Sequence, residues 1–148
     1  MSELKRIGEA CGLCDVRTFI ASGNLLFASD WPEGDIRARI EDALEAFFGK
    51  GVPVFVRSGD EMAATAAGNP FADDKPSRVM AHFIAEPPMQ AMIEAARDVA
   101  GERLALGPRC IYVSYGEGIG KTRLKVPAVK LGTARNLRSV ARIAELLA

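Results

Sequence analysis

The sequence predicts an α+β fold made of two related, intertwined ferredoxin-like halves with antiparallel sheets, the first half lacking its opening strand. Two observations support this prediction. Helical and strand-like hydrophobic periods follow one another in the order of a β-α-β-β-α-β unit, and that order occurs twice. No linker-like stretch separates the two occurrences, so we expect one domain over residues 1–148, with halves at about 1–58 and about 78–148.

The first half begins with a short helix predicted over residues 2–12. The stretches 16–21 and 25–28 are then predicted to form a hairpin, because Gly23 and Asn24 tolerate the positive φ of a tight turn. Apolar residues at helical spacing from Ile36 to Phe48 predict a long helix. The apolar run 52–57 predicts the closing strand of this half.

The second half begins after a short helix that Ser58 and Glu61 start as a capping box. Strands are expected at 78–85, 104–106 and 110–115, with a helix from about 87 to 100 between the first two. The final helix is expected to begin with Thr133 as its N-cap. The closing strand of this half has no clear pattern, and residues 125–129 are the candidate for it.

Composition narrows the classes of function. With 148 residues and 49% hydrophobic side chains, the chain can bury a core and is not a disordered sequence. It has no apolar run of membrane-spanning length and no apolar secretory signal, so we expect no membrane partner and a cytoplasmic protein with reduced cysteines. No cofactor or metal is expected, because the Cys11–Cys14 pair follows a helix instead of preceding one and lacks two nearby zinc ligands.

Charge is distributed unevenly along a chain whose net charge is zero. Residues 1–74 hold 13 acidic and 7 basic side chains, whereas residues 75–148 hold 6 acidic and 12 basic ones. One explanation is a pair of solvated faces that complement each other within one molecule or in a homodimer. The other explanation is a surface that binds an anion or a nucleic acid.

A glycine-rich basic stretch from 115 to 136 carries the candidate site, because backbone amides and cations together suit an anion. It is not a nucleotide-hydrolysing P-loop, since Tyr115 occupies the place of the first glycine and Pro127 prevents a helix directly after it. Arg135, expected in the first turn of the last helix, indicates an anionic partner unless it pairs with an acid of the first half. The candidate ligand-binding residues are Gly118, Gly120, Lys121, Thr122, Arg123, Lys125, Thr133, Arg135 and Asn136.

We therefore expect a small protein that binds a phosphate-bearing ligand, either a nucleotide or a nucleic acid, with Gly23, Asn24 and Asn69 as a candidate rim. One alternative is an enzyme whose site joins Asn24, Asn69 and the Gly-Lys-Thr loop, although no nucleophile–base pair supports it. Another is a self-associating interaction module. Readout of nucleic-acid sequence is disfavoured, because Tyr112 and Tyr115 fall on opposite faces of one strand and form no stacking platform.

Five segments in chain order match motifs of a known family: Val16–Phe27, Ala67–Phe71, Phe83–Pro88, Gly118–Leu124 and Gly132–Asn136. Together they resemble the bacterial family called domain of unknown function 1697. The resemblance implies two intertwined ferredoxin-like halves and supplies no biochemical activity. Members usually begin earlier, with a strand and an Arg-Gly-Ile-Asn-Val-Gly-Gly segment, so this chain is expected to be an N-terminally shortened member. Members also often have Trp where Leu137 stands.

Overall fold

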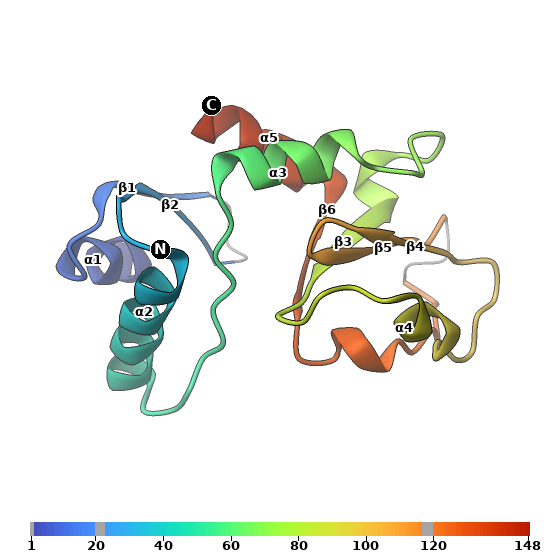
Figure 1. The fold of residues 1–148 in the computed structure, drawn as a ribbon, viewed down its shortest axis with the longest axis horizontal. Coiled ribbons are helices and arrows are strands. Elements are labelled where there is room, and N and C mark those ends of the chain that lie inside the picture. The colour runs from blue at the N-terminus through green and yellow to red at the C-terminus, as the bar shows by residue number, and fades with distance from the viewer. Residues whose placement is uncertain (1, 20–22, 117–119) are drawn as a thin grey trace. The chain divides into compact units, whose positions relative to one another are not determined.

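The computed structural model describes residues 2–19, 23–116 and 120–148. The chain forms two compact units, Met1–Arg57 and Ser58–Ala148, which we call unit 1 and unit 2. Both combine helices with an antiparallel sheet (Figure 1), so the predicted α+β class is confirmed. None of the helices in the described ranges is both long and apolar enough to cross a membrane.

Unit 1 contains a two-stranded sheet with one helix before it in the chain and one after it. Its elements are α1 (Ser2–Ala10), β1 (Cys14–Phe19), β2 (Asn24–Ala28) and α2 (Glu33–Phe48). Strands β1 and β2 pair in antiparallel register, with Thr18 opposite Leu25. The predicted hairpin and long helix are therefore confirmed, while residues 20–22, where the first strand was expected to end and the turn to begin, lie outside the described residues.

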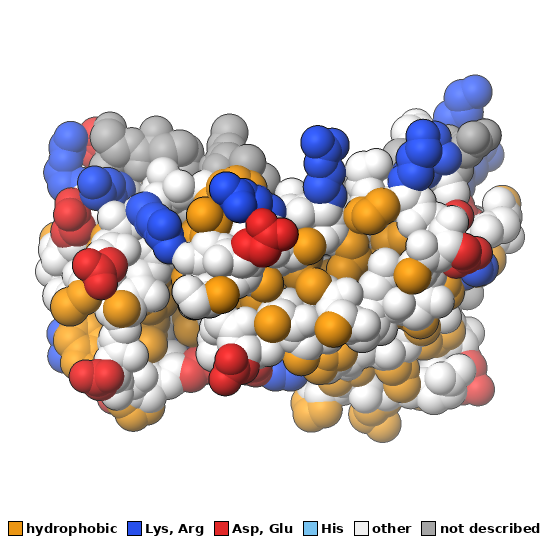
Figure 2. All heavy atoms as spheres, turned by 90° about the horizontal axis from the view of Figure 1, so that it is seen from above, with side chains coloured by type: hydrophobic (Ala, Val, Ile, Leu, Met, Phe, Trp, Pro, Cys, Tyr) orange, Lys and Arg blue, Asp and Glu red, His pale blue; other side chains and the backbone are white. Residues whose placement is uncertain are grey.

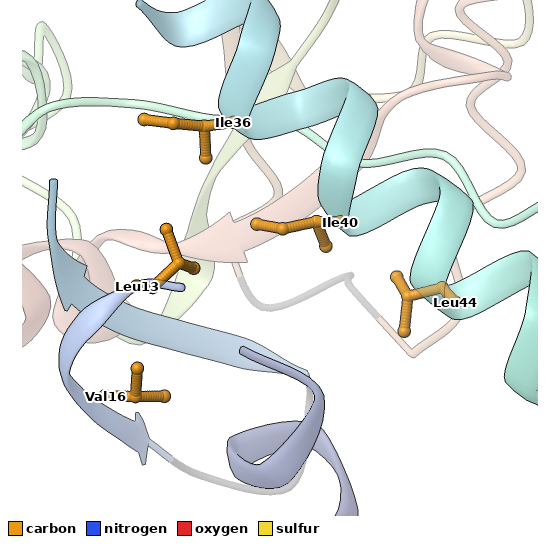
Figure 3. Close-up of a cluster of buried hydrophobic side chains, with 5 residues drawn as sticks. All are labelled: Leu13, Val16, Ile36, Ile40 and Leu44. Atoms are coloured by element: carbon orange, nitrogen blue, oxygen red, sulfur yellow. The ribbon is translucent and has the colours of Figure 1, made fainter. Parts of the chain in front are cut away.

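Unit 1 has an apolar cluster between α2 and the start of the hairpin. Figure 3 shows Ile36, Ile40 and Leu44 extending from one face of α2 toward Leu13 and Val16. The spacing of four residues places all three α2 side chains on the same stripe of the helix. Burial of that stripe removes apolar surface from water and stabilises the unit at about 25 cal/mol per Å².

Residues 52–57, predicted to form the closing strand, do not form one. Their alternate side chains nevertheless face the core, as those of a strand would. Val52, Val54 and Val56 all pack against the core of unit 1. The backbone amide of Val54, however, donates to the carboxylate of Glu41 at 3.1 Å. Within the described residues no strand lies beside this segment, because the unit 1 sheet contains only β1 and β2. The alternating apolar pattern correctly predicts which side chains are buried. It does not produce a β-strand, because a strand also needs a neighbouring strand to pair with.

Unit 2 contains a four-stranded antiparallel sheet in the order β4-β5-β3-β6. With β3 central and β6 and β5 on either side of it, this is the strand order of a ferredoxin-like sheet. The elements of unit 2 are α3 (Gly59–Ala67), η1 (Pro76–Arg78), β3 (Val79–Phe83), α4 (Gln90–Glu94), β4 (Arg103–Gly107), β5 (Cys110–Ser114), η2 (Pro127–Val129), β6 (Thr133–Asn136) and α5 (Leu137–Leu147).

The two faces of the unit 2 sheet are covered by different segments (Figure 1). On one face, Tyr112 is buried and its hydroxyl donates to the carbonyl of Thr65 in α3, at 2.6 Å. On the other, Ile111 and Val113 pack against side chains of α4 and of the segment 124–129. Since successive residues of a strand point to opposite faces, residues opposite Tyr112 in neighbouring strands share the α3 face.

The final helix begins later than predicted, because residues 133–136 form a strand. Thr133 pairs with Phe83 and Asn136 pairs with Met80, so β6 covers the free edge of β3. The N-cap is then Asn136, whose side-chain oxygen accepts from the amide of Ser139 at 2.8 Å. Asn is a stronger N-cap than Thr, and pairing satisfies the backbone groups along β3. The prediction of Thr133 as the N-cap was wrong, and so was the prediction of residues 125–129 as the closing strand.

The helix predicted over residues 87–100 is also much shorter than expected, since α4 covers only Gln90–Glu94. Beyond it, the chain turns into a β-bridge in which the backbones of Arg97 and Lys125 exchange hydrogen bonds of 2.8 and 2.9 Å. A residue paired in a bridge must adopt an extended conformation, so the helix ends before it.

Gly132 is expected to be essential for the closure of this sheet. A β-carbon at Gly132 would overlap the carbonyl oxygen of Phe83, a backbone atom that can move only with β3. Gly132→Ala should therefore destabilise unit 2 by about 1–3 kcal/mol, the usual cost of overpacking. Gly120→Ala is the matched control, because a β-carbon at that position would meet no heavy atom within 4 Å. Urea unfolding of both variants, followed by circular dichroism, measures the difference, and equal midpoints would contradict this account.

Candidate functional site

The basic segment that follows β5 contains most of the predicted ligand-binding residues. Gly116 adopts a positive φ of 56°, which turns the chain away from the strand. Gly118 lies outside the described residues, as do its neighbours 117 and 119. The described chain resumes at Gly120, whose surroundings are open.

Exposure alternates along residues 121–125. Lys121, Arg123 and Lys125 are exposed, whereas Thr122 and Leu124 between them are half-buried. Figure 2 shows Lys and Arg side chains standing out at the upper right of the view, on unit 2. Among the described residues, no carboxylate forms an ion pair with these three cations. We call Lys121, Arg123 and Lys125 the cation row.

Two inward-facing side chains fix the cation row in place. Leu124 packs against the apolar cluster of Ile111 and Val113. The hydroxyl of Thr122 donates to a carboxylate oxygen of Glu102 at 2.5 Å and accepts from the amide of Leu124 at 3.1 Å. The Thr122 hydroxyl is therefore engaged by an acid instead of being available to an anion.

Hydrogen bonds stabilise the carboxylate form of Glu102 and lower its pKa, so it is charged at neutral pH. The hydrogen bond from Thr122 contributes most to lowering the pKa of Glu102, followed by a backbone amide hydrogen bond from Ala100. The distance from the Ala100 nitrogen to the carboxylate is 2.6 Å. A negative charge thus lies on the inner side of the segment, opposite to the cation row.

The remaining predicted ligand-binding residues lie in β6, and the structure does not bring Arg135 to the cation row. Arg135 is paired with Ala81, which is paired in turn with Tyr112, so Arg135 emerges on the α3 face of the sheet. Leu124 packs on the opposite face. The Arg135 guanidinium donates to the hydroxyl of Thr133 and to the carbonyl of Ala134, both at 2.8 Å. Burial lowers the pKa of Arg135 from its ordinary value.

Arg135 lies in a strand, so it is not the basic residue in a first helical turn that the sequence predicted. Asn136 is likewise occupied as the cap of α5. Neither residue therefore indicates an anion at the start of the last helix.

The candidate rim residues are used in local turns. Gly23 has a φ of 83° at the hairpin, and the Asn24 side chain donates to the carbonyl of Phe19 at 3.0 Å. In unit 2, the side-chain oxygen of Asn69 accepts from the amide of Phe71 at 2.9 Å. Such short-range bonds are typical of Asn in turns and account for both asparagines without a ligand.

Sequence reasoning missed a polar pair beside this segment. His82 Nε2 lies 3.1 Å from the hydroxyl of Tyr115, and the two side chains come from β3 and the end of β5. Burial lowers the pKa of His82 and raises that of Tyr115. No local signal marks this pair, because the two residues are 33 positions apart and meet only through the pairing of β3 with β5.

Asp73 and Asp74 anchor their loop to the sheet. Their position in a loop had suggested that both were solvated. Arg103 in β4 donates to Asp73 at 3.0 Å and to Asp74 at 2.7 Å. The buried hydroxyl of Ser114 also donates to Asp74. These bonds lower the pKa of Asp74, the one from Ser114 contributing most. The cluster holds the loop after α3 in place, which gives both carboxylates a structural role.

Cys11 has no sign of an activated thiol. Burial is the main cause of a raised pKa at Cys11, whose sulfur lies 3.6 Å from the carbonyl oxygen of Arg39. A redox-active cysteine has a lowered pKa.

Comparison with known proteins places this chain among proteins of unknown function. The family described as "Protein of unknown function (DUF1697)" matches residues 1–112, so the match ends before the cation row. The solved structure of a conserved bacterial protein from Streptococcus pneumoniae is 25% identical, with a TM-score of 0.69 over 100% of this chain and 88% of that one. No curated protein matches.

The His82–Tyr115 pair predicts that unit 2 loses stability in mild acid. Because burial lowers the pKa of His82, the unfolded chain binds a proton first, near pH 6.5. The stability of the neutral form is therefore complete above about pH 6.5 and declines as the pH falls below it. His82 is the only histidine, so few other groups titrate in this range.

Urea unfolding at pH 7.5 and 5.5 tests this prediction. The wild type should have a lower midpoint at pH 5.5, and His82→Gln, which keeps a hydrogen-bonding side chain without the titration, should show a smaller difference. If both proteins respond equally to pH, His82 does not carry the effect.

Proposed function

Since this chain belongs to the family of domain of unknown function 1697, we propose a function from its own surface: it binds a phosphate-bearing ligand through the cation row. The observation that supports this proposal is that Lys121, Arg123 and Lys125 are exposed together without carboxylate partners among the described residues. Phosphate binding is mainly electrostatic, and unpaired cations held on an ordered segment are suited to it.

Other arginines of unit 2 stabilise the fold through ion pairs with carboxylates. Arg103 pairs with Asp73 and Asp74, and Arg109 pairs with Glu61 at 2.8 Å. Each of these pairs ties a loop or helix end to the sheet. The cation row makes no such pair with a described residue, so its charges are available to a partner in solution.

The structure gives less support to the enzyme alternative. Asn24 and Asn69 are engaged in their own turns, and the Thr122 hydroxyl is engaged by Glu102. A catalytic hydroxyl would need a base, and Glu102, with a lowered pKa, is a weak one. Binding without turnover is the simpler proposal, and the three free cysteines suit the reducing cytoplasm.

The proposal predicts that loss of one cation from the row weakens ligand binding. The test is a thermal-shift panel of pyrophosphate, ATP and a short oligonucleotide, followed by calorimetry, since a ligand of the folded state raises its stability. Lys121→Ala and Arg123→Ala should each reduce the binding free energy by about 1 kcal/mol, the scale of one basic residue near an anionic surface.

The matched control is Arg142→Ala. It removes the same charge from an exposed site in unit 2, where Arg142 pairs with Glu145 at 3.0 Å. This control should fold and bind like the wild type, because exposed ion pairs contribute little to stability. If no probe binds, or if all three variants weaken binding equally, the cation row is not the site.

A further inference from the structure

We infer that the ligand of the cation row is the phosphodiester backbone of a nucleic acid, bound through successive phosphates and without readout of its bases. This inference rests on the proposed function and names the class of ligand. It follows from the direction in which the cations point, from the charge behind them and from the aromatic side chains of unit 2.

The three cations of the row lie on the same side of their segment. Thr122 and Leu124 are held on the inner side by Glu102 and by the apolar cluster, so the three cations alternate with them on the outer side. The backbone bridge between Lys125 and Arg97 fixes the far end. Residues two positions apart are separated by at most about 7 Å of chain, so the three charges follow one another along a short segment.

A single phosphate requires a different arrangement. Sites for one phosphate gather several donors around one point, usually with backbone amides or a fork of arginine nitrogens. Here the one hydroxyl in the segment, that of Thr122, points to the Glu102 carboxylate. An anion placed on that inner side would face the negative charge of Glu102, whereas the three exposed cations of the row lie on the outer side. The structure therefore favours a ligand that presents several charges to the outer side.

A nucleic-acid backbone carries charges in line, with regular spacing along each strand. Further cations flank the row: Lys130 is exposed after it, and Arg97 is exposed at the bridge to Lys125. A backbone that follows the row past Lys125 would thus meet further positive charge.

The bases would have no stacking surface among the described residues of unit 2. Of the aromatic residues in unit 2, Phe71, Phe83 and Tyr112 are buried. Tyr115 is half-buried and its hydroxyl is bonded to His82. Proteins that grip single strands by their bases use exposed aromatic side chains, and contacts to phosphates alone carry no sequence information. Binding should therefore be independent of sequence and strongly dependent on salt.

The test uses the full chain and a fluorescently labelled oligodeoxyadenylate of about 12 nucleotides, a length within the usual range of single-strand sites. Anisotropy is measured between about 50 and 200 mM salt, with the same oligonucleotide as a duplex and in mixed sequence as further arms. Contact with three phosphates predicts a slope of log K against log salt of about −2 for the single strand. Arg123→Ala should reduce that slope by about 0.7, and Arg142→Ala should leave it unchanged. Circular dichroism confirms that both variants are folded.

ATP distinguishes this inference from the proposed function. At equal total phosphate concentration, ATP should leave the oligonucleotide bound, and mixed sequence should bind as well as oligodeoxyadenylate; binding of the duplex also supports a backbone contact. If ATP displaces the oligonucleotide, or if affinity depends on base sequence, the inference is overturned while phosphate binding stands. If neither ATP nor any oligonucleotide binds, both fail.

Discussion

The pairing of β3 on both of its edges is the constraint on which the rest of unit 2 depends. Its inward residues Val79 and Ala81 are fully buried, so the strand has one register that keeps its apolar face in the core. Pairing with β6 places Asn136 where it caps α5, and pairing with β5 places Tyr112 where it bonds α3. The segment between β5 and β6 must therefore cross from one edge of β3 to the other, and the cation row is part of that crossing.

The cation row is held in position by the uncharged residues between its cations, and not by ion pairs of the cations with other described residues. Leu124 and Thr122 supply the contacts that order the segment, and Glu102 holds Thr122 while placing an acid behind the row. The same acid prevents a phosphate from settling on the inner side. Ordered cations with no acid of their own differ from Arg103 and Arg109, whose ion pairs contribute to the fold.

Local signals predicted the local structure, and contacts between distant residues could not be predicted. The Ser58–Glu61 capping box and the β4–β5 hairpin each depend on residues that are close in sequence, and both are present. Thr133–Asn136 is polar and short, with no strand-like pattern of its own, and becomes a strand only because β3, about fifty positions earlier, has a free edge. For the site, the sequence indicated the cations of the row but not their anchor, since Glu102 meets Thr122 across 20 positions. The resemblance to the family was confirmed, and the family adds no activity to test against.

The segment 52–57 has a consequence for how the chain opens. A strand inside a ladder is protected by many backbone hydrogen bonds that must break together, whereas this segment is held by three valines and by the bond from the Val54 amide to Glu41. Regions with few protected amides open locally at low free energy, without unfolding of what surrounds them. Because unit 1 ends at Arg57 and unit 2 begins at Ser58, this segment also leads from one unit to the next. A cut within it would divide the chain into two parts, each of which contains its own sheet.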